Sequence, residues 1–335
     1  MRAPPAQTAA SAKPAASAGA SPRASASAAG KPGGPAGTAQ ATGGATSAKP
    51  AASQPAGVAA ALDQRDEPPL PEPREEGAAA VADGKLYAIA GFDKDGKDTS
   101  SVFVFDGRAW QAGPAAPAAL NHPSAASLGS DIYLTGGTGN GSSQPGVYRL
   151  SGGRWQAVAA LNHARSAPAL IALGGKLYAI GGIDRGEVGP AETYDPAANR
   201  WTDLPPLPAP RDHVAGFAYE GKACVGGGRS PNTPRVDCLD PSTSAWQRLP
   251  DLPQPTSGAG GAALNGVAIV AGGEGERIID QLAWVRGGTW QLDKMRAPRH
   301  GLQLAALNGR AYACGGGTSP GLHAVNTCTS IGVTG

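Results

Sequence analysis

Residues 165–201 read RSAPALIALGGKLYAIGGIDRGEVGPAETYDPAANRW, and this stretch decides the fold. It holds two short apolar runs on either side of Gly174-Gly175, followed by a second glycine pair at Gly181-Gly182. Two such runs around a two-residue turn predict a β-hairpin, because glycine adopts the positive φ that primed turns require. Tyr194-Asp195-Pro196 then marks a third strand and Trp201 a fourth. One four-stranded sheet is predicted.

The same pattern returns six times along the chain. The small-residue pairs that end the second apolar run are Ala90-Gly91, Gly136-Gly137, Gly181-Gly182, Gly227-Gly228, Gly272-Gly273 and Gly315-Gly316. Their second members lie 46, 45, 46, 45 and 43 residues apart. A nearly constant period of this length, without helical patterns between the copies, is typical of an array of small sheets.

One large aromatic residue recurs in the predicted fourth strands, 17 to 19 residues beyond the glycine pair. The five copies are Trp110, Trp155, Trp201, Trp246 and Trp290. A four-stranded sheet is too small to bury an indole alone, so neighbouring sheets must stack around a common axis. The sequence therefore predicts one closed, all-β ring of six sheets.

The third repeat resembles the kelch family of β-propellers. Its matching residues are Arg165, Gly174-Gly175, Tyr178, Gly181-Gly182, Tyr194-Asp195-Pro196 and Trp201. The resemblance extends over residues 58–335, whereas the Gly-His and Trp-Asp pairs of WD40 repeats do not occur. It implies a six-bladed kelch-type propeller with four-stranded blades.

The two ends of the chain predict how the ring closes. The sixth repeat stops before its fourth strand, and residues 66–74 (DEPPLPEPR) parallel residues 203–211 (DLPPLPAPR), which link a fourth strand to the next blade. Residues 58–65 are therefore expected to complete the last blade as its outermost strand. Gln64 takes the place that tryptophan holds in the other blades.

Residues 1–57 have a different composition, rich in Ala, Pro, Ser, Gly and Thr, with five basic residues and no acid. Such a segment has almost nothing to bury and is predicted to be a disordered tether, so the domains are residues 1–57 and 58–335. Without those five cations the chain has 23 basic against 26 acidic residues, a net charge of −3. This charge disfavours a nucleic-acid partner, and no apolar run reaches the roughly 20 residues of a membrane span.

The four cysteines form two equally spaced pairs. Cys224 and Cys238 are 14 residues apart, and so are Cys314 and Cys328. Each pair falls on neighbouring antiparallel strands of one repeat, where a disulfide can form, although four buried thiols are the alternative. Two disulfides would indicate an oxidising compartment, so we expect an extracytoplasmic protein, whether periplasmic, cell-surface or secreted. The N-terminus has no apolar signal core, so this localisation rests on the cysteines alone.

Candidate ligand-binding residues lie between the fourth strand of one repeat and the first strand of the next. Seventeen residues before the second member of the glycine pair, four repeats carry an arginine and the fifth carries Thr256. The shorter second repeat offers Asn121-His122-Pro123-Ser124. The candidates are Arg74, Arg165, Arg211, Arg299, His163, His213 and His300. Two interpretations stay open: arginines that bond between blades, or a clamp at the channel mouth for a carboxylate, a sulfated sugar or an acidic peptide.

No cofactor and no metal site is predicted from these patterns. The segment Asp93–Asp98 has the start of a calcium loop, but Val104 stands where an EF-hand needs glutamate. Histidines and cysteines do not occur at zinc-ligand spacing.

The favoured function is a non-enzymatic binding or scaffolding propeller, exported and monomeric, whose partner is a protein or an acidic small ligand or glycan. The resemblance also offers an enzyme, because some six-bladed kelch proteins of the bacterial periplasm interconvert the anomers of sialic acid. Such a mutarotase needs a positioned acid and base; Glu187, Glu274 and Glu276 are candidate acids, but the sequence shows no partner base for them. A purely structural module is the third hypothesis.

Overall fold

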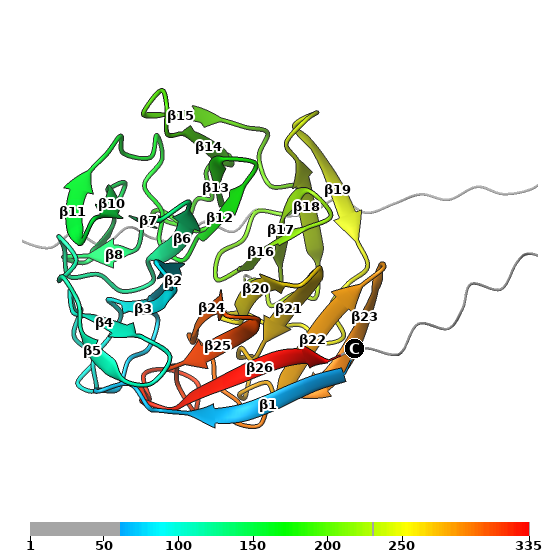
Figure 1. Ribbon diagram of the computed structural model, residues 1–335. Helices are drawn as coiled ribbons and strands as arrows, with labels where there is room; N and C mark the ends of the chain where they lie inside the picture. The colour runs from blue at the N-terminus through cyan, green and yellow to red at the C-terminus, as the bar shows by residue number, and fades with distance from the viewer. Residues whose placement is uncertain (1–60, 230, 335) are drawn as a thin grey trace, which may run out of the picture. The chain divides into compact units, whose positions relative to one another are not determined.

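The computed structural model describes residues 61–229 and 231–334. These residues form six antiparallel sheets of four strands, which are arranged in a ring as in Figure 1. The predicted all-β, six-bladed propeller is confirmed. The predicted tether, residues 1–57, lies outside the described residues.

The first three blades follow one another in chain order. Blade one has β2 (Ala78–Ala82), β3 (Lys85–Ile89), β4 (Val102–Phe105) and β5 (Trp110–Ala112). Blade two has β6 (Ser124–Leu128), β7 (Asp131–Thr135), β10 (Val147–Ser151) and β11 (Arg154–Ala157), with the small ribbon β8 (Thr138–Gly139) and β9 (Ser142–Ser143) in its loop. Blade three has β12 (Ala169–Leu173), β13 (Lys176–Ile180), β14 (Glu192–Asp195) and β15 (Arg200–Asp203).

The other three blades complete the ring. Blade four has β16 (Ala215–Tyr219), β17 (Lys222–Gly226), β18 (Val236–Asp240) and β19 (Ala245–Leu249). Blade five has β20 (Gly260–Leu264), β21 (Val267–Ala271), β22 (Gln281–Arg286) and β23 (Thr289–Lys294). Blade six has β24 (Gln303–Leu307), β25 (Arg310–Cys314), β26 (Cys328–Thr334) and, as its outer strand, β1 (Ala61–Glu67).

The innermost strands are rich in alanine and glycine because they crowd around the channel. A Cβ added to Gly216 in β16 would lie 2.6 Å from the Cβ of Ala169 in β12. A Cβ on Gly261 in β20 would lie 2.4 Å from the backbone oxygen of Gly216. Small residues therefore let neighbouring blades approach closely at the axis.

The repeated tryptophans join each blade to the one before it. Their indole N–H groups donate to a backbone carbonyl of the preceding connection at 2.8–3.1 Å, with acceptors Pro68, Pro114, Ala159, Pro205 and Pro250. Gln64 makes the corresponding bond in blade six, from its side-chain amide to the carbonyl of Lys294 at 2.8 Å. The glutamine thus keeps the hydrogen bond of the tryptophan it replaces.

The ring closes as the sequence predicts. Strand β1 pairs antiparallel with β26, from Ala61 opposite Thr334 to Glu67 opposite Cys328. Figure 1 shows these two strands, one from each end of the domain, side by side. An ion pair of 3.0 Å between Asp63 and Arg310 adds to the join.

Both predicted cysteine pairs are bonded. Cys224 lies opposite Cys238 in β17 and β18, and Cys314 lies opposite Cys328 in β25 and β26. All four sulfurs belong to buried residues. Separately, none of the described residues forms a helix long and apolar enough to cross a membrane.

Candidate functional site

Six backbone segments meet in a closed ring of hydrogen bonds at one end of the channel. One residue per blade donates its N–H to the carbonyl of the previous one at 2.7–3.1 Å, and the circuit returns to its start. We call these residues the collar: Glu76, His122, Ala167, His213, Gly258 and Gly301. Because this circuit uses only backbone groups, the side chains of the collar are free to differ between blades.

The collar backbone is left-handed in every blade. The φ angles of its six residues lie between 51° and 61°. Glycine adopts this conformation without a steric cost, whereas other residues lose roughly 1–2 kcal/mol. Two blades use glycine, but Glu76, His122 and His213 carry large side chains at this cost. Strain of this kind often marks a functional position.

The predicted arginines lie two residues before the collar, at what we call the arginine position. Its six residues are Arg74, Leu120, Arg165, Arg211, Thr256 and Arg299. Each carbonyl here accepts from the second residue of the previous blade's glycine pair at 2.7–3.2 Å. In the second blade Leu120 therefore takes this place, and His122 belongs to the collar.

The four arginine side chains are enclosed. Their residues are 1–3% exposed, and the guanidinium groups bond inside the protein. Arg165 contacts the carbonyl of Gly181 and the carboxylate of Glu192, both at 2.7 Å. Arg211 likewise contacts the carbonyl of Gly227 at 2.6 Å and the carboxylate of Asp237 at 2.9 Å. These contacts hold the glycine pair and the third strand of the same blade together.

Arg74 and Arg299 occupy the equivalent buried positions of blades one and six, but their partners differ. Arg74 stacks on the ring of Phe103 at 5.1 Å and bonds to the exposed carboxylate of Glu72 at 2.8 Å. Arg299 donates to the carbonyl of Ala313 at 2.9 Å, faces the neutral Thr329, and leaves its Nε and Nη1 without a partner among the described residues. Burial lowers the pKa of Arg299 to about 10. The clamp role predicted for these arginines stays a prediction.

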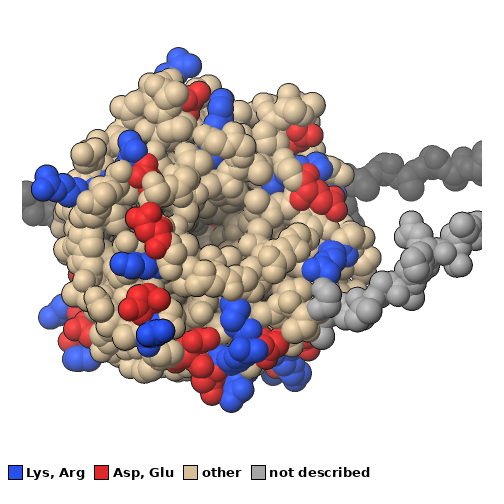
Figure 2. All heavy atoms as spheres, viewed as in Figure 1, with Lys and Arg blue, Asp and Glu red and all other residues tan. Residues whose placement is uncertain are grey.

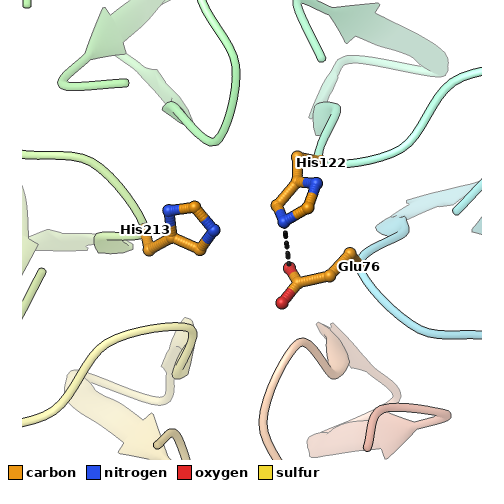
Figure 3. A group of neighbouring side chains, drawn as sticks. All are labelled: Glu76, His122 and His213. Atoms are coloured by element: carbon orange, nitrogen blue, oxygen red, sulfur yellow. Dashed lines mark ion pairs between the residues drawn. The ribbon is translucent and has the colours of Figure 1, made fainter. Parts of the chain in front are cut away.

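Three collar side chains point toward one another across the channel mouth, as Figure 3 shows. Nε2 of His122 lies 3.6 Å from Oε2 of Glu76. The ring centroids of His122 and His213 are 4.8 Å apart. One nitrogen or oxygen atom from each of the three residues lies within 4.8 Å of the other two. The mouth is therefore polar, and two imidazoles and one carboxylate converge on it.

A residue next to each collar histidine orients its ring. The Nδ1 of His122 bonds to the side-chain oxygen of Asn121, and the Nδ1 of His213 makes a short bond to the carboxylate of Asp212. Since both partner oxygens accept a hydrogen bond, they favour the tautomer with hydrogen on Nδ1. Each Nε2 then turns a lone pair toward the mouth.

Charged residues and a third histidine surround the mouth, either one residue before the collar or directly after a glycine pair. His300 contacts the buried carboxylate of Glu75 at 2.8 Å and Glu274 at 3.5 Å. Arg229, whose side chain is 42% exposed, reaches Asp212 at 3.1 Å and Nε2 of His213 at 2.6 Å. A pocket of about 130 Å³ is lined by the collar and by the first strands of the six blades, and a second pocket, of about 400 Å³, is lined by Arg229, Asn232, Ser257, Glu274, Gly275 and Glu276.

Burial shifts the pKa values of these groups. It lowers the pKa of His122 to about 4, with the positive charge of Arg229 acting in the same direction. Burial also lowers the pKa of His213 and raises that of Glu76. For His300 burial acts in the opposite direction to its acidic neighbours, and the hydrogen bond to Glu75 with the nearby carboxylates raises the pKa. The neutral imidazoles of His122 and His213 thus face the carboxyl group of Glu76, whose raised pKa favours its protonated form.

The sequence patterns identify some residues of this site but not all of them. They named His213 and His300, which are at the mouth, and His163, which instead contacts Asp203 of the outer strand β15 at 3.1 Å. They did not name Glu76 as a site residue, and they indicated His122 only as part of the shorter second repeat. Aligning the residue two places after the arginine position would have revealed both.

The space-filling view in Figure 2 shows a hollow at the centre of the ring. Its visible wall is mostly uncharged, and the Lys, Arg, Asp and Glu side chains of this face gather toward the outer blades. The charged groups of the protein that a ligand meets in the channel are therefore those at the collar and not along the walls.

Comparisons with known proteins agree with this architecture. The Kelch motif family model matches residues 73–114 and 164–208. The solved structure of YjhT superposes with a TM-score of 0.66 at 16% sequence identity, covering 80% of this chain and 99% of that one. A search of curated proteins found no match.

Two matched kelch motifs, six four-stranded blades and a ring closed between its two ends define a kelch-repeat β-propeller. This chain is a member of that class. Such propellers serve as binding or scaffolding modules or as enzymes. The role of this one has to be argued from the side chains at its mouth, because the fold alone does not determine function.

Proposed function

We propose that this protein is an exported, non-enzymatic binding propeller that takes an acidic, hydroxyl-bearing ligand beside the collar. The ligand class is a sugar acid, or the acidic group of a glycan or protein. The observation that carries the proposal is Arg229, an exposed guanidinium beside the collar in a pocket of about 400 Å³. It can receive a carboxylate, while Glu274, Asn232 and Ser257 of the same pocket can hydrogen-bond to hydroxyl groups.

Arg229 supplies the anion contact in this proposal because the four arginines predicted from the sequence point into the protein. Of the predicted residues, His213 supports the site by bonding to Arg229, whereas His300 is buried against Glu75. Export is supported by the two disulfides, which are typical of oxidising compartments. We propose a monomer, since one ring already contains the whole collar.

Calorimetric titration with N-acetylneuraminate, glucuronate and neutral glucose tests the proposal. The two acids should bind, and Arg229→Ala should weaken them about tenfold or more, the value of a hydrogen bond to a charged group. Arg248→Ala is the matched control, because Arg248 is exposed but pairs with Asp251 on the outer side of blade four. Equal binding of glucose and the acids would contradict the proposal.

The second candidate is a mutarotase, and the pair formed by Glu76 and His122 favours it. A carboxyl group with a raised pKa lies 3.6 Å from an imidazole with a lowered one, so one can donate a proton while the other accepts one. Exchange spectroscopy by NMR would show faster interconversion of sugar-acid anomers, and Glu76→Gln should abolish it. Binding without faster exchange would leave the binding role alone.

A further inference from the structure

We propose that Glu76, His122 and His213 bind a divalent transition-metal ion of the zinc class at the channel mouth. Zinc ligands at about 2.0–2.1 Å in a tetrahedral site lie about 3.4 Å from one another. Oε2 of Glu76 and Nε2 of His122 are already 3.6 Å apart. All three donor atoms lie within 4.8 Å of one another, so His213 needs to move inward by roughly 1 Å.

The neighbours of the two histidines prepare them as ligands. Asn121 and Asp212 each hold the Nδ1 atom of the adjacent imidazole, which leaves both Nε2 atoms facing the mouth. Hydrogen bonds from the far ring nitrogen to a carboxylate or amide oxygen are the usual support of metal-binding histidines. This pattern occurs twice in one ring, at the two collar positions that carry histidine.

The backbone gives an independent reason to assign a function to these three residues. They occupy left-handed conformations that Gly258 and Gly301 adopt more easily in the same ring. Large side chains at strained backbone positions are found more often at functional sites than elsewhere, although Ala167 shows that the ring also tolerates a small side chain there. Here the contribution of each large side chain is a donor atom directed at the channel axis.

The donor set selects the type of ion. Two imidazole nitrogens and one carboxylate suit Zn²⁺, Co²⁺, Ni²⁺ or Fe²⁺, whereas Ca²⁺ and Mg²⁺ prefer oxygen ligands alone. Three protein ligands also leave a coordination position open toward the pocket. The neighbouring group of Glu75, Glu76 and His300 is less suitable, because Nε2 of His300 already bonds to Glu75 at 2.8 Å.

Arg229 competes with the metal ion. Its Nη2 lies 2.6 Å from Nε2 of His213, on the lone pair that the ion would use. The side chain is 42% exposed and lies 3.6 Å from Glu274, so it can turn toward that carboxylate when the ion binds. Removing Arg229 should therefore tighten metal binding.

The experiment uses the full chain without a histidine tag, with its disulfides intact and stripped of metal by a chelator. Zn²⁺ is titrated calorimetrically, and Co²⁺ is followed by its visible absorption. One equivalent should bind, and His122→Asn and His213→Asn should each abolish binding, since asparagine tolerates the left-handed backbone. His163→Asn is the matched control and should bind as the parent does. Asp212→Asn should weaken binding about 10- to 100-fold, and Arg229→Ala should strengthen it.

The absence of stoichiometric binding, or unchanged binding in both His122→Asn and His213→Asn, would overturn the proposal. Loss of metal binding in His300→Asn with retention in His122→Asn would also overturn the proposal, because the ion would then belong to the group of Glu75, Glu76 and His300. If the histidine variants do not fold, Glu76→Gln and Asp212→Asn carry the same test. The metal titration contains no organic ligand, and the titration with sugar acids is carried out on chelator-treated protein. A failure of metal binding is therefore distinguishable from a failure of the proposed ligand binding.

Discussion

The arginine position and the collar lie two residues apart in every blade, yet the chain uses them in opposite ways. Four of the six blades place an arginine at the first, and each arginine turns inward to hold its own blade. No residue type occurs at more than two of the six collar positions, and the acidic and imidazole groups of the collar face the channel. A residue that recurs between repeats serves the repeat, whereas a residue that breaks the pattern at a strained backbone position points to the site.

The largest expected effect comes from opening the ring in which both positions lie. Deleting residues 1–67 removes β1, its pairing with β26 and the bond from Gln64 to Lys294. We expect Tm to fall by roughly 10 °C or more, at about 2–4 °C per kcal/mol for domains of 150–250 residues. Deleting residues 1–57 is the control and should change Tm little. Equal effects of the two deletions in calorimetry would refute the closure.

Arg165→Ala should be the most damaging change at the arginine position. It leaves the carboxylate of Glu192, whose side chain is fully buried, without its guanidinium partner. Breaking a buried ion pair in this way costs about 3–5 kcal/mol, measurable by urea unfolding. Combined replacement of Arg165 and Arg211 also tests the clamp prediction. Lost stability with unchanged ligand affinity would assign these arginines to the fold alone, and lost affinity in folded protein would restore the clamp.

Arg299→Met should change the free energy of unfolding less than Arg165→Met does, although the two arginines occupy equivalent positions of their blades. Arg299 has no acidic partner within residues 61–229 and 231–334, and Thr329 stands where Glu192 and Asp237 stand in the third and fourth blades. Methionine there should leave the free energy of unfolding within about 1 kcal/mol of the parent, or raise it. A loss as large as that of Arg165→Met would show that the buried charge of Arg299 is stabilised by groups not identified above.

The sequence could predict the blades because their signals are local and repeated. Paired glycines, turn dipeptides and one tryptophan per repeat report on neighbouring strands, and even Gln64 could be placed by its register. The collar was not predictable in the same way. Glu76, His122 and His213 come from three different blades, and they converge only because the ring brings equivalent positions together. The burial of the arginine side chains also depends on the third strand, whose facing residue changes from Phe103 to Glu192 to Thr329.

The smallest effect, and the one with the opposite sign, is expected at the collar. Glu76→Gly replaces a strained, partly buried carboxyl group by the residue that the left-handed backbone prefers. The free energy of unfolding should stay the same or rise by about 1 kcal/mol, because the substitution relieves the steric cost of φ near 51°. Metal binding should be lost at the same time.

Ala167→Gly is the control within the same ring, since φ is 54° there and the side chain has no donor atom. It should give a similar or smaller change in stability and leave metal binding intact. A loss of stability in Glu76→Gly with no loss in Ala167→Gly would mean that the glutamate serves the fold, as the arginines do. A gain in both variants, with binding lost only in Glu76→Gly, would show that the collar gives up stability for its site.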